Sequence, residues 1–203
     1  MAQDRTRIVI ATRNVGKIRE IVELYSDLPI EWVPIDSLGV SPEIEETGET
    51  FRDNAILKAC GISRWSGFPT LADDSGLIVD ALDGAPGVRS ARFAGEHASD
   101  ADNVRLLLER LSNVPDERRT ARFHASLIVW WSESEYDEAD GVCEGRIARA
   151  PSGNTGFGYD PVFVPDGYER SFAVLGPDVK NRLSHRARAL KRLRPMLERR
   201  LGV

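Results

Sequence analysis

The strongest constraint on the fold is a long alternation of apolar and polar residues in the second half of the chain. Between Arg119 and Trp131, apolar residues recur at every second position, which is typical of a strand with one face in the core. The segment from about Glu138 to Ala148 predicts a second long strand beside it. Two such strands need a wide core, and 203 residues with 41% hydrophobic side chains are enough to form one.

The first half of the chain alternates short apolar strands with amphipathic helices. Arg7–Ala11 is a predicted strand, and the helix that follows it has one apolar stripe. A second helix runs from Thr50 to about Trp65, where Thr50 and Asp53 have the spacing of a capping box. A short strand is predicted at Thr70–Ala72, and it ends at Asp73-Asp74-Ser75-Gly76. The stripe of the first helix consists of Ile18, Ile21, Val22 and Tyr25.

These elements indicate an α/β fold with a long mixed β-sheet flanked by helices. Helical crossovers in the first part of the chain give way to long adjacent strands in the second, which favours mixed strand pairing. Ser99 and Asp102 predict the start of one more helix between the two parts. Because no linker, repeat or low-complexity tract interrupts residues 1–203, we expect one domain.

The chain is predicted to end in a strongly basic helix. Nine Lys or Arg residues and one Glu lie between Lys180 and Arg200, although the whole chain has a net charge of -5. We interpret most of these cations as a solvated helix face; an anchor for an anionic ligand and a nucleic-acid-binding helix are the alternatives. The acidic net charge and the lack of interleaved aromatic residues argue against nucleic acid. The apolar stripe of this helix consists of Leu183, Ala187, Leu190, Leu193, Leu197 and Leu201.

Composition argues against a membrane or secreted protein. Apolar runs such as Leu127–Trp131 are far shorter than the ~18 residues of a membrane helix. The N-terminal residues have no apolar core of a secretory signal, and Cys60 and Cys143 form no metal-binding CxxC pair. We therefore expect a cytoplasmic protein with no membrane and no nucleic-acid partner.

The segment Thr12-Arg13-Asn14-Val15-Gly16-Lys17 joins the first strand to the first helix. Backbone N–H groups at a helix N-terminus favour an anion, so a phosphate fits here. The segment is not a Walker P-loop, which would need Ser or Thr in place of Ile18. A plain strand-to-helix connection with a surface lysine is the alternative.

Carboxylates gather in two segments of the chain. Glu43, Glu45, Glu46 and Glu49 lie in one loop, and Asp73-Asp74 directly follows a buried apolar strand. Such oxygen ligands suit Mg²⁺, which binds one or two carboxylates together with substrate phosphates. Each acidic residue could instead be solvated surface. Adjacent aspartates repel each other unless a positive charge compensates, so we expect a cation or a catalytic task at Asp73-Asp74.

Aromatic residues and glycines share the loop Gly153–Asp160. Glycines let a ligand approach the backbone closely, and Phe157 could stack on a base. The alternative is a glycine-rich turn whose aromatic rings fill the core. Ser184-His185-Arg186, with Lys180 before it, supplies hydrogen-bond donors that could recognise keto oxygens.

Together these segments resemble the inosine/xanthosine triphosphate pyrophosphatase family, hydrolases that remove deaminated purine nucleotides. The resemblance covers nearly the whole chain. It implies a long mixed sheet flanked by helices in two lobes, an active-site cleft between the lobes, and a homodimer. The motifs that carry it are, in chain order, Thr12-x-Asn14-x-x-Lys17; Glu45-Glu46-Thr47-Gly48 with Thr50-Phe51-x-x-Asn54-Ala55-x-x-Lys58-Ala59; Ala72-Asp73-Asp74-Ser75-Gly76-Leu77 with Gly84-Ala85-Pro86-Gly87-Val88-x-Ser90-Ala91-Arg92; Gly156-Phe157-Gly158-Tyr159-Asp160-Pro161; and Ser184-His185-Arg186.

The resemblance also implies roles in catalysis. Glu45 and Asp74 would bind Mg²⁺, Asp74 would be the base that orients or deprotonates the attacking water, and Ser75 would touch the substrate. Water would attack the α-phosphorus, and a nucleoside monophosphate and pyrophosphate would result. The residues that would hold the triphosphate are Thr12, Asn14, Lys17 and Lys58.

For the base, the resemblance implies stacking on Phe157. A donor from Arg186 would face the keto oxygen of hypoxanthine or xanthine, but in adenine it would face another donor, and an unpaired buried donor is costly. The other residues that would contact the base or line its site are Gly158, Tyr159, Asp160, Lys180 and His185.

The expected activity is therefore Mg²⁺-dependent hydrolysis of ITP, dITP and XTP, which removes these nucleotides before they enter DNA or RNA. A non-catalytic purine nucleotide-binding module and a pyrophosphatase for modified pyrimidine nucleotides are the alternatives. Two positions depart from the family pattern. Arg13 adds a bulky cation beside the phosphate loop, and Val174 stands where relatives often have Glu.

Overall fold

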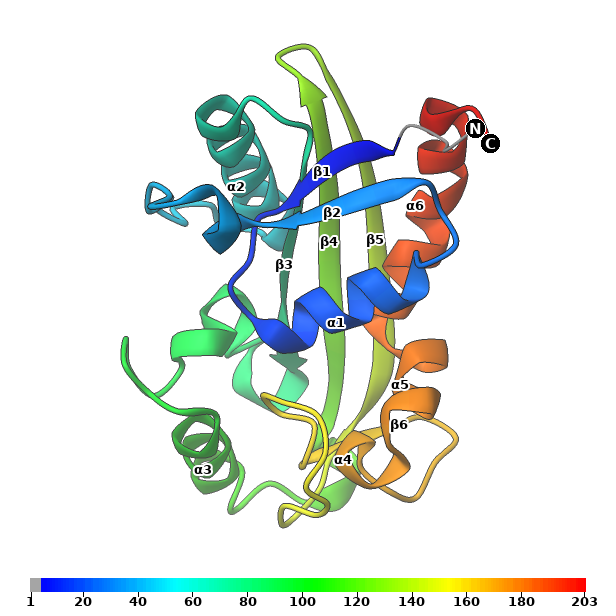
Figure 1. The fold of residues 1–203 in the computed structure, drawn as a ribbon. Helices are drawn as coiled ribbons and strands as arrows, with labels where there is room; N and C mark the ends of the chain where they lie inside the picture. The colour runs from blue at the N-terminus through cyan, green and yellow to red at the C-terminus, as the bar shows by residue number, and fades with distance from the viewer. Residues whose placement is uncertain (1–4) are drawn as a thin grey trace. The chain divides into compact units, whose positions relative to one another are not determined.

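A computed structural model describes residues 5–203 of the chain (Figure 1). Short 3-10 turns connect several of the helices and strands. The strands are β1 (Thr6–Ile10), β2 (Ile30–Pro34), β3 (Thr70–Val79), β4 (Thr120–Ser132), β5 (Glu135–Ile147) and β6 (Phe163–Pro165). The helices are α1 (Val15–Leu24), α2 (Phe51–Ser66), α3 (Asp100–Arg110), α4 (Phe172–Leu175), α5 (Pro177–Leu183) and α6 (His185–Leu201).

The strands form one six-stranded sheet in the order β2-β1-β3-β4-β5-β6. β1 pairs in parallel with both β2 and β3, whereas β5 and β6 are antiparallel. Only Glu133 and Ser134 separate β4 from β5, a connection short enough for a hairpin. The sheet is therefore mixed, and the predicted α/β class with a long mixed sheet flanked by helices is confirmed.

The chain forms two compact units, and β3, β4 and β5 contribute residues to both. The first unit contains the chain up to Asp74, Ala125–Gly141 and Arg186–Val203; the second contains Ser75–His124 and Val142–His185. The predicted single domain and the predicted cleft stay predictions.

In the first unit, strand alternation sends neighbouring residues to two separate apolar clusters. Leu71 of β3 packs in a cluster with residues of α1 and α6, whereas Ala72 packs in a cluster with residues of α2 (Figure 1). The same division holds in β1, where Ile8 and Val9 enter different clusters. This follows from the period of two in a strand, and it means that α1 and α6 cover one face of these strands while α2 covers the other.

The second unit has its own apolar core. Leu107 of α3 and Leu111, which caps its C-terminus, pack there with Phe123 of β4 and Phe163 of β6. Phe123 and Phe163 contact each other at a ring-centroid distance of 4.6 Å. The predicted start of α3 is confirmed, because Ser99 caps the helix and forms a complete capping box with Asp102.

The predicted short strand at Thr70–Ala72 is wrong in its end point. β3 continues to Val79, so Asp73 and Asp74 lie inside a buried strand rather than in a turn after it. Local sequence suggests a turn there, since aspartates and glycine favour turns. Cations from helices neutralise both carboxylates, and the strand can therefore continue.

The basic C-terminal segment is two helices and not one. Ser184 adopts an extended backbone that ends α5, and α6 begins at His185. The predicted apolar stripe of α6 is confirmed at Ala187, Leu190 and Leu193, which are buried, whereas Leu183 packs with the second unit's core. In α1, Val22 is exposed and does not belong to the buried stripe. Within residues 5–203 no helix is long and apolar enough to cross a bilayer.

Arg119 links three backbone segments of the second unit. Its guanidinium donates to the carbonyl oxygens of Leu111 at 2.6 Å, Ile147 at 2.9 Å and Ala148 at 3.0 Å, and the residue is only 2% exposed. A buried cation that donates to three carbonyls replaces the water that these oxygens would otherwise need.

Replacing Arg119 by Met should therefore destabilise the protein. We expect Arg119→Met to lower the free energy of unfolding in urea by about 3 kcal/mol, because buried carbonyl oxygens lose their donors. Arg122→Met in the adjoining strand β4 is the matched control, since its ion pair with Asp80 is solvent-exposed and should be worth less than about 1 kcal/mol. Equal losses in the two variants would contradict this role of Arg119.

Candidate active site

The segment between β1 and α1 is built as a helix start. Asn14 caps α1, and its side-chain oxygen accepts from the backbone N–H of Lys17 at 3.1 Å. The Thr12 hydroxyl accepts from the backbone N–H of Asn14 at 3.2 Å. These bonds fix the turn and start the helix such that Lys17 lies in its first turn.

Lys17 and Arg186 both bind Asp73. The Lys17 ammonium lies 2.8 Å from Asp73 Oδ1, and the Arg186 Nε lies 2.5 Å from Asp73 Oδ2. Arg186 also donates from Nη1 to Glu20 of α1 at 2.5 Å. The side chains of Asp73 and Arg186 are at most 1% exposed. A buried carboxylate thus joins β3 to the first residues of α1 and α6.

Lys58 of α2 binds the neighbouring carboxylate. Its ammonium lies 2.8 Å from Asp74 Oδ1 and 3.2 Å from Glu46. Asp73 and Asp74 face different helices because successive side chains of a strand point to opposite faces. Asp73 shares the face of Leu71 with α1 and α6, and Asp74 shares the face of Ala72 with α2. We call these seven charged residues the lysine–aspartate cluster: Lys17, Glu20, Glu46, Lys58, Asp73, Asp74 and Arg186.

The two adjacent aspartates differ in protonation chemistry. Burial raises the pKa of Asp73, but the charges of Arg186 and Lys17 outweigh it and hold the pKa well below its usual value. Burial also raises the pKa of Asp74, and here Lys58 and Lys17 do not fully offset it, so the pKa stays above its usual value. Two carboxyl groups whose environments separate their pKa values are typical of a site in which one is a permanent anion and the other exchanges a proton.

The two lysines also differ. Burial lowers the pKa of Lys17, and Asp73 only partly opposes that effect. Burial acts on Lys58 in the same direction, but Asp74 and Glu46 together raise its pKa above the usual value. Lys58 is therefore a firmly held cation beside the carboxylate with the raised pKa.

One oxygen of Asp74 fits a divalent cation. Asp74 Oδ2 is buried and has no hydrogen-bond partner among the residues that the structure describes. A buried carboxylate oxygen of this kind is a hard ligand that suits Mg²⁺. No group of three or more His, Cys, Asp or Glu side chains suited to a metal occurs within residues 5–203. Mg²⁺ is usually bound by one or two carboxylates and takes its other ligands from substrate phosphates and water, so a single carboxylate oxygen matches this pattern.

Glu45 and Glu46 occupy different positions in the acidic loop. Glu46 reaches Lys58, whereas Glu45 is exposed. The buried Asn54 of α2 accepts from the backbone N–H of Gly48 at 2.8 Å and so ties the end of this loop to the helix. The predicted metal ligand Glu45 stays a prediction, and the structure adds Glu46 and Asn54 as residues that hold the loop.

A second group of functional candidates lies in the second unit, around residues 153–161, which we call the Phe157 loop. Asp160 Oδ2 accepts from the Phe157 N–H at 2.9 Å and from the Lys180 ammonium at 2.6 Å. The Lys180 ammonium also lies 4.0 Å from the centroid of the Phe157 ring. A Cβ on Gly156 would lie 2.2 Å from Asp160 Oδ2, so this close approach requires glycine. Asp160 and Lys180 thus set the place of Phe157.

Tyr159 and His185 are held within the second unit. The Tyr159 side chain is buried in the core, and its hydroxyl donates to the carbonyl of Ser90 at 2.8 Å. The ring therefore fills the core, as the alternative interpretation of this loop expected, while Phe157 is only partly buried. His185 is 4% exposed and stacks on Phe123 at a centroid distance of 4.7 Å. Ser75 is partly buried.

The structure assigns contacts that sequence reasoning missed. Arg186, predicted as a base contact, is engaged by Asp73 and Glu20 in the first unit. The sequence motifs predict no contact for Glu20 and no particular partner for Asp73, because nothing local shows that distant elements bring one arginine to both carboxylates. Two positions differ from the family pattern. Arg13 contacts Asp36 at 3.0 Å and Ser41 at 2.6 Å, and Val174 is exposed.

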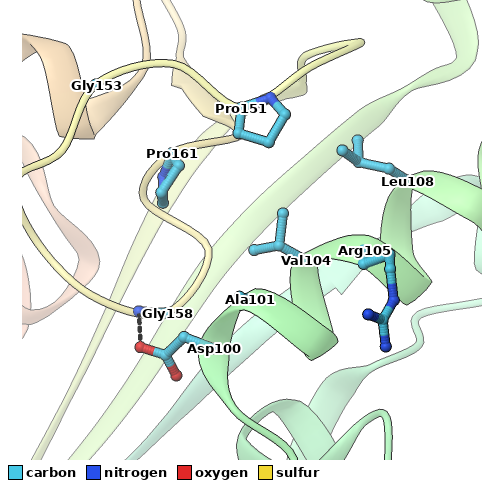
Figure 2. A pocket seen from close by; sticks show the side chains of 9 residues that line it. All are labelled: Asp100, Ala101, Val104, Arg105, Leu108, Pro151, Gly153, Gly158 and Pro161. Atoms are coloured by element: carbon cyan, nitrogen blue, oxygen red, sulfur yellow. Dashed lines mark hydrogen bonds between the residues drawn. The ribbon is translucent and has the colours of Figure 1, made fainter.

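The Phe157 loop borders a cavity of about 450 Å³ (Figure 2). Val104 and Leu108 point from α3 toward Pro151 and Pro161 across this space. At one edge of it, Asp100 accepts from the backbone N–H of Gly158 at 2.6 Å. Gly158 is the lining residue that had been predicted to contact the base, and Asp100 was not among the predicted site residues.

Comparisons with known proteins agree with these motifs. A protein of Geobacillus kaustophilus named dITP/XTP pyrophosphatase is 47% identical over 195 residues, which cover 96% of each chain. The solved structure of a HAM1 protein from Coxiella burnetii superposes with a TM-score of 0.87 at 44% identity and covers 96% of this chain and 99% of that one. A structure from Mycobacterium abscessus, titled nucleoside-triphosphatase and dITP/XTP pyrophosphatase, gives a TM-score of 0.77 at 44% identity, covering 94% of this chain and 100% of that one.

The family comparison covers nearly the same length. The sequence pattern described as the Ham1 family matches residues 8–196, a range that includes every residue of the lysine–aspartate cluster and the whole Phe157 loop. The chain therefore belongs to the Ham1 family.

Proposed function

We propose that this protein hydrolyses the deaminated purine nucleotides ITP, dITP and XTP to a nucleoside monophosphate and pyrophosphate. The observation that carries the proposal is the pair Asp73-Asp74, in which one carboxylate is a permanent anion and the other has a raised pKa and a buried oxygen without a partner. The relatives named dITP/XTP pyrophosphatase support the same reaction and substrate class.

Asp74 and Glu45 are the residues that would hold Mg²⁺. The charge of the cluster supports a metal, because four carboxylates already outnumber its three cations. A triphosphate would meet no net positive charge there unless a divalent cation came with it. When bound, Mg²⁺ would polarise the phosphates and neutralise charge on the departing pyrophosphate.

The chain's own residues would then do three things. Asp74 accepts the proton of the attacking water. Lys17 and Lys58 stabilise negative charge on the phosphates, and Asp73 keeps Lys17 in position. Thr12 and Asn14 at the start of α1 and Ser75 after Asp74 complete the proposed phosphate contacts.

The base would bind to the residues of the second unit. Phe157 offers a ring for stacking, and Asp160, Lys180 and His185 offer polar groups, with Gly158 and Tyr159 contributing main-chain atoms.

Arg186 would also contact the base. Its guanidinium donates to Asp73 and Glu20. We propose that the same group also donates to the keto oxygen of hypoxanthine or xanthine. Adenine would present a donor at that place, which supports discrimination against ATP. We further propose a homodimer in the cytoplasm with one domain per chain and no nucleic-acid partner.

The first test is the base candidate itself. Asp74→Asn removes the proton acceptor and a metal ligand, so we expect kcat for ITP to fall by at least about a thousandfold. The measurement is pyrophosphate release with Mg²⁺ and with a chelator. Asp80→Asn is the control, because Asp80 lies just after the same strand and its carboxylate binds only surface groups, Thr120 and Arg122. Unchanged turnover in Asp74→Asn would refute the proposed base.

The second test addresses the substrate. We expect ITP and XTP to be hydrolysed at least about tenfold faster than ATP or GTP, a difference of ~1.4 kcal/mol in the barrier. The reaction should stop when the metal is chelated. Equal rates on all four nucleotides and on dTTP would leave a hydrolase without base selection. Tight nucleotide binding without hydrolysis would instead favour a binding module.

The third test concerns base stacking. Phe157→Ala should raise KM for ITP by about tenfold, because stacking of an aromatic ring on a base is worth roughly 1–3 kcal/mol. Inhibition by pyrophosphate, which has no base, should stay at the wild-type level. A variant with wild-type KM would show that Phe157 does not stack on the purine.

A further inference from the structure

The backbone on both sides of Phe157 is held by a carboxylate. Asp160 accepts from the N–H of Phe157 at 2.9 Å, inside the loop. Asp100, the first residue of α3, accepts from the N–H of Gly158 at 2.6 Å (Figure 2). Each N–H lies in a rigid peptide plane, and the two planes meet at the Cα of Phe157. Holding both planes restricts the φ and ψ angles of Phe157 and hence the direction of its Cα–Cβ bond, from which the ring extends.

Asp100 does this from outside the loop. Its α3 neighbours Val104 and Leu108 face Pro151 and Pro161 across the cavity of about 450 Å³. Apolar packing between side chains on opposite sides of a cavity is weak, because dispersion forces decay within a fraction of an ångström beyond contact. The Asp100–Gly158 bond is therefore a direct polar contact that ties this part of the loop to α3.

The bond is suited to this task. Asp100 lies at the N-terminus of α3, where the helix dipole favours an ionised carboxylate, and a charged acceptor makes a stronger hydrogen bond than a neutral one. Gly158 has φ +59, a left-handed conformation that glycine adopts without strain. A glycine without a fixed partner would leave the peptide plane after Phe157 able to rotate.

We propose that Asp100 is a positioning residue for purine binding, which acts by fixing the peptide plane after Phe157 so that the ring faces the base. This inference rests on the proposed function, since it takes Phe157 as the base-stacking residue. It adds that the affinity for the base depends on a side chain of α3 that does not touch the nucleotide.

The experiment compares two product ligands that differ in the base. IMP contains hypoxanthine, whereas pyrophosphate has no base. In Asp100→Ala we expect the dissociation constant of IMP, measured by calorimetry, to rise about tenfold, which is ~1.4 kcal/mol. The dissociation constant of pyrophosphate should stay within about twofold, because phosphate contacts lie elsewhere. Amide hydrogen exchange of residues 157–160 should become faster in the same variant.

Two further variants make the test specific. Asp100→Asn keeps a carbonyl oxygen that can accept from Gly158, so it should restore most of the IMP affinity. Arg105→Ala is the matched control, because Arg105 lies on the same helix and lines the same cavity but pairs with Asp102 at the exposed surface. Its affinities for IMP and pyrophosphate should equal those of the wild type.

The outcomes separate this inference from the proposed function. Faster exchange in Asp100→Ala with unchanged IMP affinity would overturn the positioning role, and so would an equal loss of IMP and pyrophosphate affinity, which indicates general damage. A wild-type protein that binds IMP but does not hydrolyse ITP would overturn the proposed reaction alone. A wild-type protein that does not bind IMP would overturn both.

Discussion

The ion pairs of Asp73 are the interaction on which the candidate site depends. A carboxylate with no exposed side-chain surface is costly to bury, and here Lys17 and Arg186 compensate it directly. Because this charge is neutralised, β3 can run through two adjacent aspartates inside the protein. The same contacts tie α1 and α6 to one face of the strand. One buried anion therefore holds a strand and two helices together and sets where the lysine of α1 lies.

Continuation of the strand has a chemical consequence. The period of two sends Asp73 and Asp74 to opposite faces, so adjacent residues enter different surroundings. Asp73 meets two cations and stays ionised, whereas Asp74 meets Lys58 and keeps one buried oxygen that has no hydrogen-bond partner within residues 5–203. A turn at this point would expose both carboxylates to water and leave them with similar pKa values. The regular geometry of β3 thus gives two adjacent aspartates different partners.

In the second unit, carboxylates hold the backbone of the Phe157 loop. Asp160 and Asp100 accept from backbone N–H groups on the two sides of Phe157, and Lys180 neutralises Asp160 while it lies against the Phe157 ring. Tyr159 anchors the same loop in the core. The partly exposed ring is therefore held by backbone bonds and by its buried neighbour. This is a stable way to present an apolar surface in a loop that otherwise has little packing.

Local periodicity and capping were enough to predict the class of the fold, the helix starts at Thr50 and Ser99 and most of the buried stripe of α6. The adjacent aspartates also indicated a cation or a catalytic task near Asp73-Asp74, since like charges repel. The identity of the neighbouring cations follows from the packing of the helices against β3. The partners of Asp73 come from α1 and α6, more than 50 residues away in each direction, and the bond from Asp100 to Gly158 spans 58 positions. Hydrogen bonds and ion pairs between such distant residues depend on how the strands and helices pack, which no local pattern of residues records.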